Sequence, residues 1–573
     1  MRIKIFAAII IFSFFVLGAG LFYTQILRHD TYSELSEKNR IRVLPLAAPR
    51  GRVYDRNGTL LVSNEISFDV EVVYQEIKDK QKIIDTLILM LSEDKDKLTE
   101  RIEAARKKPF VPVKIAEDVK KDMAIKVEEV TLDLPGVIVT TRPRRNYIYK
   151  NALSHVTGYI GKISEAELKR YKTYGYRMQD FVGKDGIERQ CNDYLRGIDG
   201  GLQVEVDSRG RQVRILALKE PIPGKDVYLS IDARLQEFCD SVLGKKKGAV
   251  IAMDPETGAV LALVSNPDYD PNIFVTSNNT KKRLALLNDS RTSPMLNRAI
   301  GTSHPLGSVF KIVIAAAALE EGKFTERSTL SCNGAYYVGG RAFHCWREKG
   351  HGGQNITQAM KHSCNVFFYQ LGISLGADKI AQYAFKFGLG KPSGIDLPGE
   401  TGGFVPTISW KKTKLRQPWF KGETANYSIG QGYLLVTPLQ ASRLTGAVAA
   451  GGKLARPFLV ERIGDVTIRQ DEPENLNLKR DTLRAVKKAL KDVVNAPRGT
   501  GVYARSKKVT ISGKTGTAQN PRGRSHAWFV GFAPFEKPGI SVVVFLEHGG
   551  KGGLEPARFA KKIIEKAREL ELL

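Results

Sequence analysis

A serine and a lysine three residues apart, Ser308 and Lys311, form the first pattern in the chain that can do chemistry. They lie in HPLGSVFKI, where Pro305 and Gly307 interrupt the chain before a long apolar run that reads as a buried helix. In the first turn of a helix, residues three apart share a face, so the lysine amine can reach the hydroxyl. A lysine whose pKa is lowered by burial can take the hydroxyl proton and make the serine a nucleophile. The alternative is a serine that only caps a core helix.

The S-x-x-K spacing alone is weak, because the chain repeats it at Ser92–Lys95 and Ser409–Lys412. Two further motifs follow in order. Ser363-Cys364-Asn365 is an S-x-N, which also occurs at Ser277–Asn279, and Lys514-Thr515-Gly516 is the only K-T-G in the chain. The β-branched run before the K-T-G predicts a strand. The order S-x-x-K, S-x-N, K-T-G is the signature of penicillin-recognising serine acyltransferases.

Each motif predicts a role in acyl transfer. Ser308 is expected to attack a carbonyl and form an acyl-enzyme, with Lys311 as the base. Ser363 and Asn365 can relay a proton and hold the substrate amide. Lys514 supplies a cation for a substrate carboxylate. The residues expected to bind substrate beside this cation are Thr515 and Thr517, through hydrogen bonds, and Gly516, through close backbone approach.

The N-terminus predicts a membrane anchor. An uncharged and mostly apolar stretch runs from Ile5 to Leu27, long enough to cross a bilayer core as a helix. Arg2 and Lys4 before it favour a cytoplasmic N-terminus. Arg28, directly after the stretch, weakens this charge asymmetry. We therefore expect residues 1–4 as a cytoplasmic tail and 5–27 as a transmembrane helix, with the rest of the chain outside the cytoplasm. A cleaved signal peptide is the alternative.

The remaining sequence predicts an α+β protein with a non-catalytic domain at 28–225 and a catalytic domain at 226–573. Asn57-Gly58 and Asp254–Gly258 each separate two apolar runs, which indicates β-hairpins. Residues 75–130 are highly charged with a helical pattern, and we interpret them as a solvated helical appendage.

The formal net charge is +27. Such a charge suits nucleic acid, anionic lipid or an anionic polymer. The basic residues are spread along the chain, without a finger, Walker or RNP-type motif, so we expect no nucleic-acid partner.

Several long segments resemble class B penicillin-binding proteins. They include PRGRVYDRNGTLL, GAVIAMDPETGAVLALVSNP, LNRAIGTSHPLGSVFKI and SGKTGTAQ. SHAWFVGFAP and GLQVEVDSRGR are most similar to the penicillin-binding protein 2 subfamily, the elongation transpeptidases. The resemblance runs from about Pro49 to Pro556. Two positions depart from it: His304 stands where many relatives carry Tyr or Pro, and Asn365 where some carry Asp.

The resemblance implies an anchor, an elongated pedestal domain of the dimerisation type, and a C-terminal transpeptidase domain with an antiparallel sheet flanked by helices. It implies a peptidoglycan D,D-transpeptidase that cross-links stem peptides in cell-wall elongation, releases D-Ala and is acylated by β-lactams. The implied location is the inner membrane with a periplasmic catalytic domain. The implied partners are lipid-linked nascent glycan, a SEDS-type membrane glycosyltransferase and a rod-shape scaffold protein. The backbone N–H groups of Ser308 and Thr517 are the implied oxyanion hole.

Three of the five cysteines cluster in sequence with a histidine, as Cys332, Cys345, His351 and Cys364. Three thiolates and an imidazole make a closed tetrahedral zinc site, so we expect a structural zinc here and no cofactor for catalysis. The resemblance supports this, since some relatives carry a metal site in the same region. His344 is an alternative ligand. A Cys332–Cys345 disulfide or buried free thiols are the rival interpretations.

Two other functions use the same motifs. A β-lactam hydrolase or carboxypeptidase passes the acyl group to water, and the anchor and pedestal favour the synthase over it. A non-enzymatic sensor or scaffold is the third possibility. The single predicted span and the expected lack of a cytoplasmic domain argue against a sensor.

Overall fold

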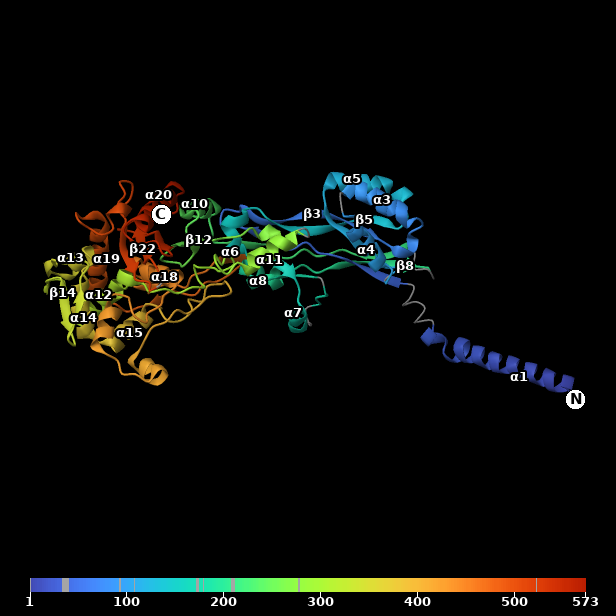
Figure 1. Cartoon of the computed structure of the whole chain (residues 1–573), viewed down its shortest axis with the longest axis horizontal. Helices are drawn as coiled ribbons and strands as arrows, with labels where there is room; N and C mark the ends of the chain where they lie inside the picture. The colour runs from blue at the N-terminus through green and yellow to red at the C-terminus, as the bar shows by residue number, and fades with distance from the viewer. Residues whose placement is uncertain are drawn as a thin grey trace. The chain divides into compact units, whose positions relative to one another are not determined.

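The computed structural model describes residues 2–32, 41–91, 94–107, 109–171, 175–178, 180–207, 212–276, 279–521 and 523–573 (Figure 1). The chain divides into two compact units. The first comprises Met1–Gly51, Asn64–Arg144 and Arg196–Lys225. The second comprises Arg52–Ser63, Arg145–Leu195 and Asp226–Leu573, and it carries all of the catalytic motifs.

The first unit begins with helix α1 (Arg2–Phe22), which continues as a π-helical turn over Tyr23–Leu27. Residues Ile3–Leu27 are long and apolar enough to cross a membrane, with a mean hydropathy of 2.6, and none of this window is buried. A helix that is apolar and exposed on all sides among the described residues matches the expected anchor in length and composition.

The charged region of the first unit has a core of its own. Helices α3 (Lys80–Leu91), α4 (Lys95–Ala105) and α5 (Lys121–Val130) lie beside strands β3 (Leu60–Val72) and β4 (Val113–Val119) (Figure 1). Their buried apolar residues form one cluster that includes Leu87, Leu98, Ile102 and Val127. The expected helices are present, but β4 and this core make the region more than a solvated appendage.

A second sheet of the first unit has three strands, β1 (Ile41–Leu46), β8 (Gly200–Val206) and β9 (Gln212–Lys219), in the order β1-β8-β9. Both pairs are antiparallel. The last four residues of the quoted GLQVEVDSRGR segment lie outside the described residues.

Both predicted hairpins are confirmed. In the second unit, Val53 pairs with Val62 across the turn at Asn57-Gly58, where Gly58 has φ +79°. Strands β11 (Gly248–Met253) and β12 (Val260–Asn266) pair across a turn that ends at Gly258, with φ +86°. Glycine takes positive φ without a steric cost, which explains its place in both turns.

The catalytic motifs are built around a five-stranded antiparallel sheet with the order β12-β11-β23-β22-β21. Its C-terminal strands are β21 (Ser512–Ala518), β22 (His526–Ala533) and β23 (Ile540–Leu546). Every residue of β11, β12, β22 and β23 is buried, as expected for strands covered on both faces. β21 is an edge strand of this sheet and carries the K-T-G motif.

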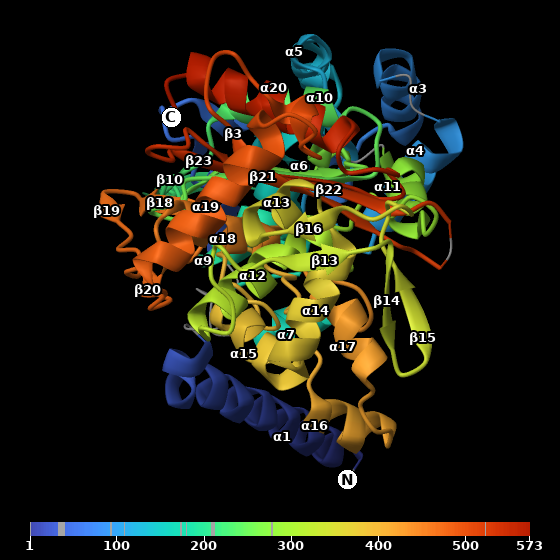
Figure 2. The same cartoon turned by 90° about the vertical axis from the view of Figure 1, so that its left-hand side faces the viewer.

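Helices cover the sheet on both faces (Figure 2). α10 (Ala233–Leu243) and α20 (Glu555–Glu569) contact each other, and they pack on β12 and β23. On the other face, α18 (Pro438–Ala449) contacts β11, β22 and β23. The further helices on this side are α12 (Lys311–Glu320), α13 (Ile356–Lys361), α14 (Asn365–Leu375), α15 (Ala377–Lys386), α17 (Lys421–Ser428) and α19 (Arg480–Asn495).

Candidate active site

The nucleophile candidate lies on a short turn and not within the long helix itself. Ser308 is part of a 3-10 turn, Gly307–Phe310, and Lys311 is the first residue of α12. The residues of α12 from Lys311 to Ala318 are all buried, so the helix is a core helix as expected. Ser308 is half-buried, whereas Lys311 is fully buried. No hydrogen bond joins their side chains in the described part of the chain.

The S-x-N motif forms the turn between α13 and α14. Ser363 has φ +51°, a left-handed backbone that an L-residue adopts only with strain. Cys364 is the N-cap of α14, and its sulfur accepts a hydrogen bond from the Phe367 N–H at 3.5 Å. Asn365 is the first residue of that helix. The turn therefore holds Ser363 and Asn365 in fixed positions at the start of α14.

The three motifs meet at the hydroxyl of Ser363. Lys514 Nζ donates to Ser363 Oγ at 3.0 Å, and Lys311 Nζ donates to the same oxygen at 3.2 Å. Lys311 Nζ also donates to the Asn365 Oδ1 at 2.8 Å and to the Ser363 carbonyl at 2.9 Å. Lys514 Nζ donates to the Thr515 carbonyl at 3.0 Å. The predicted Ser363, Asn365, Lys311 and Lys514 are thus brought together.

Burial changes the acid–base properties of both lysines. Desolvation lowers the pKa of Lys311 to about 8. Desolvation, and then the charge of Lys311, holds the pKa of Lys514 well below its usual range. The charge of Lys311 therefore disfavours the protonated form of Lys514, because both amines lie beside one hydroxyl.

Glycines allow the nucleophile turn to approach strand β21. A Cβ on Gly307, which has φ +58°, would lie 2.8 Å from the Thr517 carbonyl oxygen. A Cβ on Gly516 would lie 2.9 Å from the Leu306 carbonyl oxygen. Both contacts are closer than side-chain carbons allow, so backbone lies directly on backbone here. This approach brings the turn carrying Ser308 beside Thr517, whose side chain is exposed.

The one repeated pattern that lies wholly within the described residues does not form such a site. Ser409 and Lys412 lie on exposed helical turns at Ile408–Trp410 and Lys411–Leu415. The other repeats begin at Ser92 and Ser277, which are outside the described residues.

The four predicted metal ligands also come together. The ligand atoms of Cys332, Cys345, His351 and Cys364 all lie within 4.8 Å of one another. His351 Nδ1 is 3.6 Å from the Cys332 sulfur and 3.5 Å from the Cys345 sulfur. All five cysteines of the chain are free, so the Cys332–Cys345 disulfide does not form in this structure. The cluster can hold a metal ion directly behind the turn that carries Ser363.

Several side chains around the site were not singled out from the sequence. The His362 ring stacks on His351 with centroids 5.6 Å apart, and its Nδ1 is 2.7 Å from Gln354 Oε1. Trp346 Nε1 donates to the His362 carbonyl at 3.0 Å. Arg298 forms a second polar network with Glu547 and Thr302, and Arg298 and Thr302 lie in the segment that precedes Ser308 in the sequence. In the sequence, the only indication of a role for these residues was that a charged or aromatic side chain occurs close to a catalytic motif.

Two protein families match the chain. The profile of the penicillin binding protein transpeptidase domain matches residues 248–565, and that of the penicillin-binding protein dimerisation domain matches residues 45–229. The peptidoglycan D,D-transpeptidase MrdA of Acinetobacter baumannii is 35% identical over 98% of this chain and 87% of its own length. MrdA of Escherichia coli is 34% identical over 94% of this chain and 89% of its own.

Solved structures give the same assignment. PBP2 of Helicobacter pylori, in a complex with MreC, superposes with a TM-score of 0.82 at 30% identity, over 93% of this chain and all of that one. PBP2 of Pseudomonas aeruginosa superposes with a TM-score of 0.71 at 30% identity, over 91% of this chain and 96% of that one. The predicted α+β fold class, family and reaction are confirmed. The chain belongs to the class B penicillin-binding proteins of the penicillin-binding protein 2 type, which are peptidoglycan D,D-transpeptidases of cell elongation and targets of β-lactams.

Proposed function

We propose that this transpeptidase acylates Ser308 and that Lys311, Ser363, Asn365 and Lys514 move the protons of the reaction. The observation that carries the proposal is the shared hydroxyl of Ser363, which accepts hydrogen bonds from both lysines. A hydroxyl between two amines can accept a proton from one side and donate its own to the other. It therefore connects a base beside the nucleophile with an acid beside the leaving group.

The first half-reaction forms the acyl-enzyme. Ser308 Oγ attacks the carbonyl of the penultimate D-Ala of the donor peptide while neutral Lys311 takes the hydroxyl proton. The backbone N–H groups of Ser308 and Thr517 stabilise the oxyanion. The C–N bond then breaks, and the departing amine of the terminal D-Ala receives a proton through Ser363. Lys514, with its neighbours Thr515, Gly516 and Thr517, holds the terminal carboxylate of the donor.

The second half-reaction transfers the acyl group. The amine of an acceptor stem peptide attacks the Ser308 ester and loses a proton to Lys311. The ester C–O bond breaks, an amide forms, and the serine oxygen regains a proton. Water in place of the amine gives hydrolysis, so slow turnover of a penicilloyl-enzyme distinguishes a transpeptidase from a β-lactam hydrolase.

A fluorescent penicillin tests the nucleophile assignment. The wild-type chain is expected to be labelled at Ser308, as located by peptide mass analysis, and Ser308→Ala is expected to remain unlabelled. Ser409→Ala is the matched control, because Ser409 also begins an S-x-x-K but lies on an exposed turn. Labelling that persists in Ser308→Ala, or that disappears in Ser409→Ala, contradicts the assignment.

We also propose that the chain is a single-pass protein of the inner membrane, with its N-terminus in the cytoplasm and the catalytic unit in the periplasm. Helix α1 supports this through its length, its apolar composition and its exposure within the part of the chain that the structure describes. A protease added to spheroplasts should remove the catalytic unit. Protection of that unit until the membrane is lysed would contradict the orientation.

The proposed partners are the lipid-linked nascent glycan, a SEDS-type glycosyltransferase and a rod-shape scaffold. The Helicobacter pylori relative in complex with MreC supports the scaffold, and a relative with a TM-score of 0.75 was solved in a peptidoglycan synthase complex. Co-purification of the full-length chain from membranes with its glycosyltransferase and scaffold tests this. Recovery of the chain without either protein after gentle cross-linking would contradict it.

Finally, we propose that the Cys332, Cys345, His351 and Cys364 cluster binds a structural zinc ion. Tetrahedral zinc with its usual bond lengths places sulfur and nitrogen ligands about 3.5 Å apart. The two sulfur–nitrogen distances of 3.5 and 3.6 Å fit this value. A bound zinc supplies no chemistry to the reaction. Its role is to hold the turn around Cys364, and thereby to keep Ser363 beside Lys514 of strand β21.

A further inference from the structure

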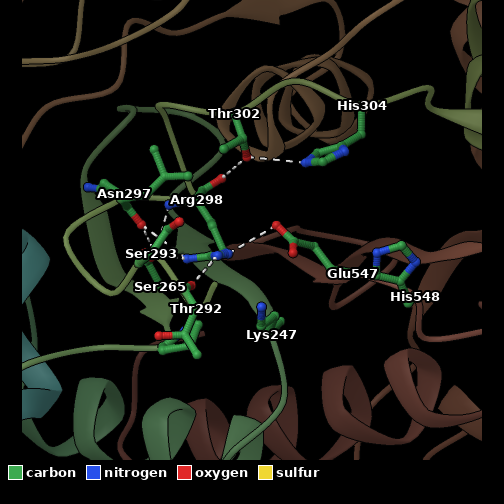
Figure 3. A network of polar contacts seen from close by, with 12 residues as sticks. Lys247, Ser265, Thr292, Ser293, Asn297, Arg298, Thr302, His304, Glu547 and His548 are labelled. Carbon is green, nitrogen blue, oxygen red and sulfur yellow. Dashed lines mark hydrogen bonds and ion pairs between the residues drawn. The ribbon is translucent and has the colours of Figure 1, made fainter. Parts of the chain in front are cut away.

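Arg298 holds the segment before the nucleophile to the end of a strand of the catalytic sheet (Figure 3). Its side chain is 4% exposed, and its Nε donates to Glu547 Oε1 at 3.0 Å. The other guanidinium nitrogens donate to the Thr292 carbonyl at 2.8 Å and to the Ser293 carbonyl at 3.1 Å. The two ends of the ion pair are 249 residues apart in the sequence.

One arm of this network leads from Arg298 to the nucleophile turn. The Thr302 hydroxyl donates to the Arg298 carbonyl at 3.2 Å and lies 3.3 Å from His304 Nε2. Because the hydroxyl has a single proton, its contact with His304 requires an N–H on Nε2. Burial, followed by the charges of His526 and Arg298, lowers the pKa of His304 to about 3, so this ring stays neutral. His304 lies four residues before Ser308.

The other arm leads from Glu547 to the same histidine. The backbone N–H of His548, the next residue, donates to His526 Nδ1 at 3.2 Å. The His526 ring lies 4.7 Å from the His304 ring, and Phe545 lies 4.6 Å from it. His526 begins strand β22 opposite Ala518, the last residue of β21. The contacts of Arg298 therefore close into a ring of residues that passes through the start of β22 and the segment directly after β23.

The segment held by this ring lies directly on the catalytic strand. Trp528 Nε1 donates to the Pro305 carbonyl at 3.1 Å. The Leu306 carbonyl oxygen is close enough to Gly516 to exclude a side chain there. A displacement of His304 by one ångström would therefore shift Ser308 against Lys514, and misplacement on this scale costs on the order of 10²-fold in rate.

We propose that Arg298 is a positioning residue for acylation, which acts through Glu547 and His304 to fix the nucleophile turn against strand β21. The proposal rests on the assignment of Ser308 as the nucleophile. An arginine paired with a carboxylate in a buried site is directional, since its planar fork admits one orientation, whereas apolar packing alone tolerates small slips. A purely structural role predicts lower stability with normal chemistry, so the two roles separate in kinetics.

Acylation kinetics of the full-length chain in detergent test this. For a fluorescent penicillin, the acylation rate constant k2 and the dissociation constant K are measured together with Tm, with rates normalised to the titrated active sites. Glu547→Ala and Arg298→Lys are expected to lower k2 by about tenfold or more with K within about twofold of the wild type. Glu547→Gln keeps an acceptor and should recover part of k2. The double variant should lose no more than the stronger single variant, because both break one contact.

Glu321→Ala is the matched control. Glu321 pairs with Lys379 and accepts from the Tyr383 hydroxyl in the same unit, on a more exposed side chain than that of Glu547, and no contact given for it involves the residues linked to Arg298. It should lower Tm and leave k2 unchanged. If Arg298→Lys does not fold, Thr302→Val removes the hydroxyl between Arg298 and His304 at nearly constant volume and should still lower k2.

Unchanged k2 in folded Glu547→Ala and Thr302→Val overturns the positioning role. A proportional fall of k2 in Glu321→Ala overturns it as well, because stability alone then explains the effect. Neither result affects the nucleophile assignment, which is tested separately by the penicillin labelling of the wild type, Ser308→Ala and Ser409→Ala.

Discussion

Lys514 Nζ donates a hydrogen bond to Ser363 Oγ over 3.0 Å, and this bond joins the catalytic strand β21 to the turn before α14. The two residues are 151 positions apart in the sequence. The bond connects the sheet to the helices that carry the other two motifs. The Ser363 hydroxyl therefore holds Lys514 and Lys311 together in one hydrogen-bonded site.

Two substitutions of Ser363 separate its hydroxyl from its backbone. The residue has φ +51°, which glycine adopts without strain and alanine does not. Ser363→Ala and Ser363→Gly should both lower the acylation rate by about 10²-fold or more, because the proton relay is lost. Ser363→Gly should have the higher Tm of the two. Near-normal penicillin acylation of Ser363→Gly would show that the hydroxyl is dispensable.

The acylation rate should rise with pH. Burial lowers the pKa of Lys311 to about 8, and only the neutral amine can accept the proton of Ser308. Below this pKa the neutral fraction increases about tenfold per pH unit, and above it the rate should level off. Measuring k2/K for penicillin at pH values below and above 8 checks both the rise and the plateau. Lys311→Arg should be slow at every pH, and a wild-type rate that falls as the pH is raised through 8 contradicts the base assignment.

Gly307 should not tolerate a side chain, for two separate reasons. It has φ +58°, and a Cβ would lie 2.8 Å from the Thr517 carbonyl oxygen. Gly399 is the control, because it has φ +84° but open space around a Cβ. Gly399→Ala should cost about 1 kcal/mol of backbone strain and leave acylation intact. Gly307→Ala should cost about 1–3 kcal/mol more and reduce k2, as measured by thermal unfolding and penicillin kinetics.

Metal analysis should find one zinc per chain. Cys332→Ser should lose the metal and lower both Tm and k2, because the turn at Ser363 loses its support. Cys239→Ala is the control: its thiol is also fully buried, but it lies on α10 outside the cluster. This variant should keep its zinc even if it is less stable. A purified wild type well below one equivalent of zinc, with a disulfide detected by mass, would contradict the site.

Residues close in sequence were predictable because their structure depends on local chemistry. The glycine turns at Gly58 and Gly258 follow from the conformational freedom of glycine, and the strand at Lys514 follows from its β-branched neighbours. The helical pattern of residues 75–130 was also readable, but strand β4 and the core beneath it were not. A short strand in a charged segment gives no clear periodic signal.

By itself, the sequence determined the identities, spacing and order of the three motifs, and through them the family and the reaction. Only the tertiary structure decided that Lys311 and Lys514 share the Ser363 hydroxyl and that Ser308, the proposed nucleophile, lies on a 3-10 turn before helix α12. It also decided that Arg298 meets Glu547. These contacts join segments tens to hundreds of residues apart, and their geometry comes from strand pairing and close backbone packing, which the spacing of residues along a chain does not encode.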